Sequence, residues 1–385
     1  MKNRIYLDYA ATTPVSPEVL ETMFPFFSEC WGNASGIYAT GREARRAAED
    51  ARKAVAAAIG AQPGEIIFTS GGSESDNTAI LGTAYAQQEK GKHIITTGIE
   101  HHAVLNPCRQ LQKEGFEVSF LQTDREGRID PEEIRKAIRS DTILVSIMTA
   151  NNEIGTIEPV NEIGQICKEK KIVFHTDAVQ AIGSLPVNVQ EINCDLLSLS
   201  AHKFYGPKGI GALYIRERTR LNPLISGGEQ ERGVRAGTEN IPGIAGLGKA
   251  ITLANENLDR NARHMRQMRD QLVKGILSSV PGAALNGPEE NRLPNNCNFK
   301  FDGIDGEALL LRLDLAGIAA SAGSACTAGS REISHVLRTI GLTEAEAKSS
   351  LRLTTGIHTT EEEISDTVKI IEETVKDLRK TFAKA

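Results

Sequence analysis

Lys203 is a candidate nucleophile at the end of a predicted strand, in the run DLLSLSAHKFYGPKG. An ammonium group close to a protein core is costly, so the pKa of such a lysine tends to fall, and a neutral amine can attack an aldehyde. Ser200 and His202 flank it. The alternative is a surface lysine at a turn, an interpretation that suits Lys208 better because it lies just before the next strand.

A turn that could hold a phosphate follows an earlier strand, in FTSGGSESDNTAI. Gly72 and Ser73 lead there into a helix whose first turn contains Glu74, Ser75 and Asp76. Backbone N–H groups at the start of a helix favour an anion, and glycine lets that anion approach closely. The alternative is a plain glycine turn with a helix cap, since the run matches neither GxGxxG nor GxxxxGK[ST].

Two further strand ends carry an imidazole and a carboxylate. His101 and His102 follow HIITTG, where an imidazole could stack on a planar ring or move protons, although adjacent histidines in loops are more often just solvated. Asp177 follows the apolar start of KIVFHTDAVQAIG, where a buried carboxylate needs a cationic partner. Gln180 would share its face if a helical turn starts there. An aspartate that only caps a helix is the competing interpretation.

Together these residues define one kind of cofactor site. A phosphate cradle, an aromatic stacker, a carboxylate and a lysine follow one another along a predicted parallel sheet, whose strand ends gather ligands. Pyridoxal phosphate requires this set: a cradle for its phosphate, a face for its ring, an aspartate to keep its pyridine nitrogen protonated, and an amine for its aldehyde. The sequence therefore predicts a pyridoxal-phosphate site.

The elements that must position these residues alternate between apolar strands and amphipathic helices. The strand-like runs are EIIFTS, HIITTG, EVSFLQTD, TILVSIMTA, KIVFHTDA, DLLSLSAHK and GIGALYI. Nearly continuous apolar strands indicate a sheet covered on both faces, so we expect an α/β fold with a mostly parallel, doubly wound sheet. We expect this large cofactor-binding domain to span residues 15–255.

A second, smaller α+β domain is predicted from residues 1–14 and 256–385. Long polar helices begin at ANENLDRNARHMRQMRDQLVKGI, and NNCNFKFD is strand-like. The last helix repeats its apolar residues at steps of three and four, and Thr360 with Glu363 forms a capping box at its start.

Bulk composition excludes several classes of protein. The 385 residues carry a net charge of −6, which leaves no basic footprint for nucleic acid. The sequence has neither a signal peptide nor an apolar run long enough to span a membrane, so the cytoplasm is the expected location. The six cysteines are scattered without CxxC pairs or Cys/His clusters, which predicts neither a disulfide framework nor a metal site.

Nine motifs resemble those of the cysteine desulfurases of the NifS/IscS type, within the class V aminotransferase group of fold-type-I pyridoxal-phosphate enzymes. In order along nearly the whole chain they are LDYAATTP, SGGSESDN, EHHAVL, NNEIG, HTDAVQ, SAHKFYGPKG, QERGVRAGTEN, SAGSACTAGS and SSLRLTTG. The resemblance implies a homodimer with pyridoxal phosphate as cofactor and L-cysteine as substrate.

The resemblance also implies roles at the cofactor. Lys203 would bond to its aldehyde, Asp177 would pair with the pyridine nitrogen, and His101 would stack on the ring. Gln180 and Asn152 would contact the side of the ring that carries the oxygen. The phosphate would be held by Gly72, Ser73, Ser200 and His202, and Thr238 would reach the phosphate of the partner subunit's cofactor.

For the substrate, the resemblance implies that Arg352 clamps the carboxylate, with Asn152 beside it. Cys326 would accept sulfur from L-cysteine as a persulfide and leave L-alanine. A free thiol with a pKa of about 8.5 is only a few per cent ionised at neutral pH, so His101 is the candidate to help deprotonate it. The small residues around Cys326 favour a mobile loop that could collect sulfur and deliver it.

The expected recipient of the sulfur is an acceptor protein, either an iron–sulfur scaffold protein or a tRNA-thiolation enzyme. The sequence departs from the family pattern at two places, and the second bears on which acceptor protein receives the sulfur. In SGGEQERG, Glu229 replaces the third glycine of the usual GGGQE run, which alters the local turn or its charge. The chain also ends at KDLRKTFAKA, without the longer tail that engages the scaffold in some relatives.

Other functions use fewer of these residues. A selenocysteine lyase would need almost the same set, and an aminotransferase would not need Cys326. A cofactor-free thiol sulfur carrier would explain Cys326 but would leave Lys203, Asp177 and the phosphate turn without a role. A nucleotide-binding regulatory protein could use the glycine turn, but the turn lacks the lysine of a P-loop.

Overall fold

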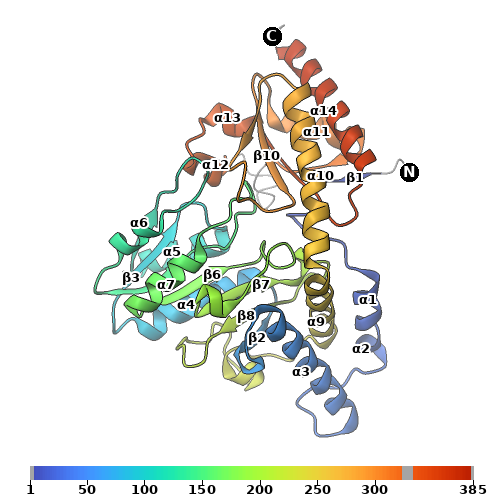
Figure 1. Ribbon diagram of the computed structural model, residues 1–385. Coiled ribbons are helices and arrows are strands. Elements are labelled where there is room, and N and C mark those ends of the chain that lie inside the picture. The colour runs from blue at the N-terminus through green and yellow to red at the C-terminus, as the bar shows by residue number, and fades with distance from the viewer. Residues whose placement is uncertain (1–3, 323–332, 383–385) are drawn as a thin grey trace.

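The computed structural model describes residues 4–322 and 333–382, and a seven-stranded sheet forms its centre (Figure 1). The strand order is β2-β8-β7-β6-β5-β3-β4. The strands from β7 to β4 run parallel, whereas β8 is antiparallel to both neighbours. The predicted α/β class with a mostly parallel sheet is therefore confirmed. The strands are β2 (Ile66–Thr69), β3 (His93–Thr97), β4 (Glu117–Leu121), β5 (Thr142–Ser146), β6 (Val173–Asp177), β7 (Leu196–Ser200) and β8 (Gly211–Ile215).

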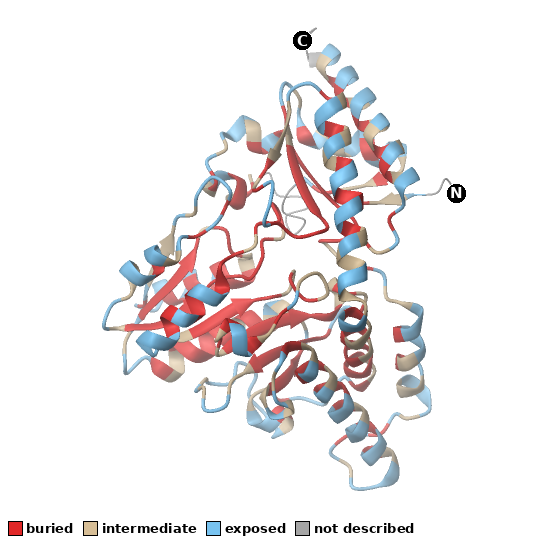
Figure 2. Cartoon of the chain, in the orientation of Figure 1, coloured by how far each residue is buried: buried red, intermediate tan, exposed pale blue. Residues whose placement is uncertain are grey.

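Helices cover both faces of this sheet. One face packs against α3, α7 and α9, and the other against α4 and α5. The strands β3, β5 and β7 are buried along their whole length (Figure 2), which explains their continuous apolar sequences. The helices of this part are α1 (Pro17–Met23), α2 (Pro25–Ser28), α3 (Ala39–Ile59), α4 (Gly72–Gln87), α5 (His102–Lys113), α6 (Pro131–Ala137), α7 (Val160–Lys170), α8 (Val189–Ile192) and α9 (Ile241–Glu256).

The C-terminal part has its own three-stranded antiparallel sheet, in the order β12-β10-β9, with a core shared by α10, α11 and α14. Of the apolar stripe predicted for the last helix, Ile364, Ile371, Val375 and Leu378 are buried there, and the predicted capping box is present. The Thr360 N–H donates to Glu363 Oε2 (2.8 Å), and the Glu363 N–H donates to Thr360 Oγ1 (3.2 Å). The elements are α10 (Leu258–Ser279), β9 (Ala283–Asn286), β10 (Asn296–Phe301), α11 (Gly306–Ala316), α12 (His335–Thr339), α13 (Glu344–Lys348), β12 (Ser350–Thr354) and α14 (Glu361–Phe382).

The first described residues join this C-terminal part. Strand β1 (Ile5–Tyr6) pairs in parallel with β11 (Ile318–Ala319), and Leu7 is buried in the same core. The boundary predicted after residue 255 falls where α9 gives way to α10, although the division into two domains remains a prediction. Within the described ranges, no helix has the length and apolarity needed to cross a membrane.

A buried ion pair fixes the turn Gln230–Gly233 beside the sheet. Arg52 of α3 donates from Nη1 and Nη2 to the two carboxylate oxygens of Glu231, each at 2.8 Å. Glu231 and Arg232 have φ values of 44° and 58°, in the left-handed region that non-glycine residues rarely adopt. Glu229, the departure from the glycine-rich family pattern, is exposed just before this turn, so its charge faces solvent.

Replacement of Glu231 should destabilise the fold. Glu231→Gln leaves the Arg52 guanidinium buried without a full counter-charge, so the free energy of unfolding should fall by roughly 3–5 kcal/mol. Urea denaturation measures this loss. As a control, Asp50→Asn removes the exposed pair of Asp50 with Lys53 on the same helix and should cost less than about 1 kcal/mol. Equal losses in the two variants would contradict the importance of the buried pair.

Candidate active site

A cavity of about 330 Å³ lies at the carboxyl ends of β6 and β7, where α4 and α5 begin. This volume is typical of small-ligand sites, which occupy about 300–1,000 Å³. Ten of the twelve residues predicted from the sequence line it: Gly72, Ser73, His101, Asn152, Asp177, Gln180, Ser200, His202, Lys203 and Arg352. Cys326 lies outside the described residues. Thr238 is exposed and does not line the cavity, so its contact with a partner's cofactor remains a prediction.

Lys203 is held by the backbone of the N-terminal LDYAATTP segment. It follows β7 in a short 3-10 helix, and its Nζ donates to the carbonyl oxygens of Ala10 (2.6 Å) and Ala11 (2.9 Å). Gln180 Nε2 donates to the same Ala10 carbonyl (3.0 Å). The N-terminal segment thus forms one wall of the cavity and fixes the position of the amine.

Asp177 is the last residue of β6, and only 5% of it is exposed. Its Oδ1 accepts a hydrogen bond from the Val179 N–H (2.9 Å). Burial raises the pKa of the Asp177 carboxyl to about 6, while this hydrogen bond and the Lys203 ammonium oppose the rise. The carboxylate is therefore mostly ionised at neutral pH and can pair with a protonated ring nitrogen.

His101 caps the N-terminus of α5. Its Nδ1 accepts a hydrogen bond from the Ala103 N–H (3.1 Å), so the neutral ring carries its proton on Nε2. Burial lowers the pKa of His101 to about 4, and the positive charges of Lys203, His102 and His335 add to this effect. The imidazole is therefore neutral at pH 7 and presents an uncharged ring to the cavity.

The turn before α4 has the shape of an anion cradle. Gly71, with a φ of 151°, caps the helix that Gly72 begins. A Cβ atom at Gly72 would lie 2.7 Å from Val179 Cγ2, so only glycine fits without a shift of its neighbours. The N–H groups and the dipole of this helix favour an anion. This cradle, with the Ser73 and Ser200 side chains on the cavity wall, fits the phosphate of pyridoxal phosphate.

Arg352 is a buried cation on β12, with 1% of its surface exposed. Its Nη2 donates to Asp8 Oδ1 (2.8 Å), and its Nη1 donates to the Asn152 carbonyl (3.1 Å). These two partners hold the guanidinium at the cavity. Its planar donor fork can recognise a carboxylate there.

Sequence reasoning missed several residues of the cavity. Asp76 and Glu153 line it from within motifs that were quoted for other residues, SGGSESDN and NNEIG. His335 does not follow any of the strand-like runs read from the sequence and had no local signal there. Its ring lies 4.6 Å from that of His102, between centroids, and its Nε2 donates to the Glu100 carbonyl (2.9 Å).

The buried cysteines of the described chain are structural. Burial raises the pKa values of Cys108, Cys167 and Cys297 to about 12, and it also raises that of Cys194. Such thiols stay protonated and unreactive.

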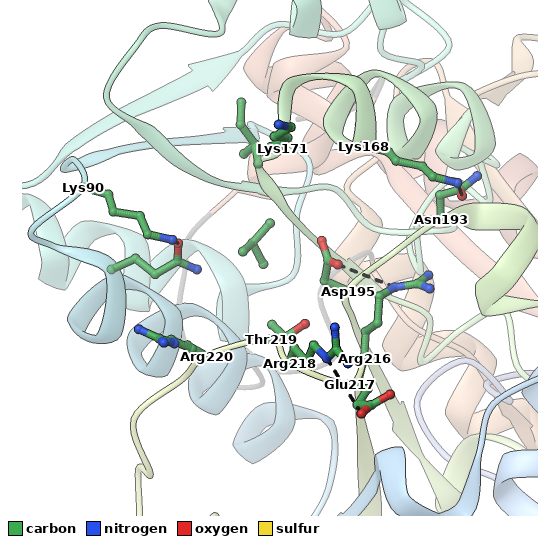
Figure 3. A pocket seen from close by; sticks show the side chains of 13 residues that line it. Lys90, Lys168, Lys171, Asn193, Asp195, Arg216, Glu217, Arg218, Thr219 and Arg220 are labelled. Atoms are coloured by element: carbon green, nitrogen blue, oxygen red, sulfur yellow. Dashed lines mark hydrogen bonds and ion pairs between the residues drawn. The ribbon is translucent and has the colours of Figure 1, made fainter.

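A separate hollow of about 420 Å³ lies at the opposite, amino ends of β6 and β7 (Figure 3). Its charged residues are Lys90, Lys168, Lys171, Arg216, Arg218, Arg220, Asp195 and Glu217. The chain as a whole has a net charge of −6, so its composition gives no indication of this local basic cluster. None of the predicted site residues lines it, so it is not part of the candidate active site.

The family model for Aminotransferase class-V matches residues 5–366, and the chain belongs to this family. A protein named cysteine desulfurase IscS from Dictyoglomus turgidum is 55% identical over 98% of this chain and 96% of its own length. Another of that name, from Methanosarcina thermophila, is 53% identical over 97% of this chain and 93% of its own length. The resemblance to the NifS/IscS type is confirmed.

Solved structures share the same fold. A NifS-like protein superposes with a TM-score of 0.92 and 40% identity, covering 97% of this chain and all of that one. A structure titled "SspA in complex with cysteine" has a TM-score of 0.83 and 40% identity, covering 92% of this chain and all of that one. The predicted fold type I is therefore confirmed.

His175 lies behind Asp177 on the same face of β6, because alternate residues of a strand share a face. Its Nδ1 is 2.8 Å from Ser146 Oγ, and its Nε2 is 3.0 Å from Ser198 Oγ. The ring is fully buried, and burial lowers its pKa from 6.5 to about 3. His175 is therefore a neutral member of a polar row inside the sheet.

Acid should destabilise the protein through His175. The unfolded chain takes up a proton near pH 6.5 and the folded protein only near pH 3, so stability falls as the pH falls below 6.5. Between about pH 7.5 and 5 this one group should cost roughly 2 kcal/mol. His175→Gln cannot take up that proton, so urea denaturation at the two pH values should show a loss smaller by that amount. An unchanged pH dependence would contradict a neutral, buried His175.

Proposed function

We propose that the chain is a pyridoxal-phosphate-dependent cysteine desulfurase. The reaction would convert L-cysteine and the Cys326 thiol to L-alanine and a Cys326 persulfide, which balances without an oxidant or reductant. One observation carries this proposal: Lys203, Asp177 and Arg352 line a single cavity together with a glycine turn at a helix start. The names of the relatives and the cysteine complex of a similar structure support the reaction and its substrate.

The residues of the cavity fit the proposed cofactor. When bound, pyridoxal phosphate would supply an electron-withdrawing ring that weakens bonds at the substrate Cα. Asp177 would keep the ring nitrogen protonated, because an ionised carboxylate favours a nearby cation. The flat, neutral ring of His101 would lie against the ring face, and Gln180 and Asn152 would face its oxygen. The phosphate would be held by Gly72, Ser73, Ser200 and His202.

Lys203 would bond to the aldehyde of the cofactor and, once displaced by the substrate amine, would hold and move protons. The carbonyl groups of Ala10 and Ala11 keep its Nζ at the cavity and leave it little freedom. A positioned amine of this kind can act first as a nucleophile and then as a general base.

Arg352 would bind the substrate carboxylate. Asp8 and the Asn152 carbonyl already orient its guanidinium, so binding would lose little side-chain freedom. With the carboxylate and amine fixed, the substrate sulfur would be presented to the Cys326 thiolate. His101 is proposed to assist the loss of the thiol proton: its imidazole is neutral at working pH, and Nδ1 would accept the proton after release of its hydrogen bond from the Ala103 N–H.

We also propose that the protein works as a homodimer in the cytoplasm and passes sulfur to an iron–sulfur scaffold protein or a tRNA-thiolation enzyme. The stretch from α1 to the start of α3 exposes many large apolar side chains, namely Leu20, Phe24, Phe27, Trp31, Ile37 and Tyr38. Apolar side chains gathered on a surface mark interaction sites. This stretch is the region expected to be covered by a second copy of the chain.

Lys203→Ala should abolish the lysine-bound form of the cofactor. Purified wild-type protein should be yellow after reconstitution, and borohydride should fix the cofactor to the chain, because the aldehyde is bonded to the Lys203 amine. The variant should show neither the absorbance band nor the fixed label. Lys208→Ala is the control, since Lys208 is exposed on the same loop and should keep both. Wild-type protein that stays colourless after reconstitution would overturn the proposed function.

Cys326→Ser should keep the yellow colour and lose persulfide formation, because a serine hydroxyl cannot accept the sulfur. Alanine production from L-cysteine should fall at least about a hundredfold, as expected on removal of a nucleophile. Cys30→Ser provides the comparison, because Cys30 is the partly exposed cysteine among those the structure describes, and it should keep the wild-type rate. Alanine release by Cys326→Ser at the wild-type rate would exclude the role given to this thiol.

A further inference from the structure

A second carboxyl group lies beside Asp177 inside the candidate active site. Asp76, near the start of α4, lines the same cavity, and only 1% of it is exposed. Helix α4 packs over β6 and β7, on the face that carries His175 and Asp177. Two acidic side chains thus share one water-poor region.

The described residues supply a positively charged partner for Asp177 but not for Asp76. Asp177 receives a backbone hydrogen bond and faces the Lys203 ammonium. Within the described chain, Asp76 forms no ion pair with a lysine or arginine, and its Oδ1 has no hydrogen-bond partner. The nearest ring atom, His175 Nε2, lies 3.5 Å away and is already within 3.0 Å of Ser198 Oγ.

His175 does not supply the missing positive charge. Its ring is fully buried between the Ser146 and Ser198 hydroxyl groups and remains neutral. Glu100, the other acidic group that acts on Asp76, brings no positive charge either. Burial, together with the charges of Asp177 and Glu100, raises the pKa of Asp76 well above its usual value, and the Ser198 hydroxyl opposes this only in part.

We propose that Asp76 is a positioning residue held as a neutral carboxylic acid. Asp76 and Asp177 together then carry one negative charge, which lies on Asp177. This inference rests on the proposed function, because the charge on Asp177 is what would keep the ring nitrogen of the cofactor protonated. When two adjacent carboxyl groups disfavour each other's ionisation, the one without a positively charged partner holds the proton.

The neutral state of Asp76 also bears on Lys203. Nearby anions stabilise the charged form of an amine. A second carboxylate beside Asp177 would stabilise the Lys203 ammonium further, and the amine must lose that proton before it can act as a nucleophile. With Asp76 protonated, the two carboxyl groups carry one negative charge, on Asp177, which balances the positive charge of a protonated ring nitrogen.

Infrared spectroscopy of the protein without added cofactor tests the protonation states. A protonated carboxyl group has a carbonyl band, sensitive to deuterium exchange, that a carboxylate lacks. At about pH 7.5, subtraction of the Asp76→Asn spectrum from that of wild type should show one lost protonated band, whereas Asp177→Asn should lose only a carboxylate band. The other buried acids, Glu100, Glu153 and Glu158, are common to all three proteins and cancel. The opposite assignment of the two bands would overturn the proposal.

Cofactor binding gives a second readout. Titration of the cofactor-free proteins with pyridoxal phosphate should show at least tenfold greater loss of affinity in Asp177→Asn than in Asp76→Asn, because only Asp177 carries charge (about 1.4 kcal/mol). The reverse order would contradict the proposal. If Asp76→Asn fails to fold, the Asp177→Asn spectrum is the test: burial is the largest cause of the raised Asp76 pKa, so the protonated band should remain after the Asp177 charge is removed. If neither wild type nor either variant binds the cofactor, the proposed function is wrong, but the infrared spectra still test whether Asp76 is protonated.

Discussion

The cost of burying charge at the carboxyl edge of the sheet is the constraint on which the candidate site depends. Asp177 can stay ionised at the end of a buried strand because the Val179 N–H and the Lys203 ammonium face it. Lys203 in turn is held by the carbonyl groups of Ala10 and Ala11. A buried ion is tolerated only when its partners are fixed in place. These partners come from distant parts of the chain, so the charge requires the complete fold.

Helix α4 shows how one element can serve two ends of a ligand. Its first residue, Gly72, lets the helix start pack closely against Val179, and the backbone N–H groups of a first helical turn can face an anion. Asp76, one turn later, lies over the polar row of Ser146, His175 and Ser198. A displacement of this helix would therefore disturb the phosphate cradle and the buried acids together, which makes its packing against β6 and β7 a functional requirement.

Local rules identified the residues that directly follow strands. Lys203, Asp177 and His101 lie at strand ends, and a parallel sheet brings such ends together whatever their separation in sequence. The same rules could not find Arg352, because it lies inside β12 and not at the end of a strand. The alternation of residues along a strand does not distinguish a functional side chain from other buried ones. Only the family resemblance indicated Arg352. His335 was missed because it does not follow any of the strand-like runs read from the sequence. The domain division and the place of Cys326 remain predictions, since neither follows from strand patterns.

The contact of Asp8 with Arg352 joins residues that are 344 positions apart, and β1 pairs with β11 over a similar span. A ribosome makes the N-terminal segment first, long before these partners exist. Until they emerge, the segment that carries the carbonyl groups of Ala10 and Ala11 has no fixed place, and the lysine amine cannot be held at the cavity. The order of synthesis therefore delays completion of the candidate site until β11 and β12 have been made.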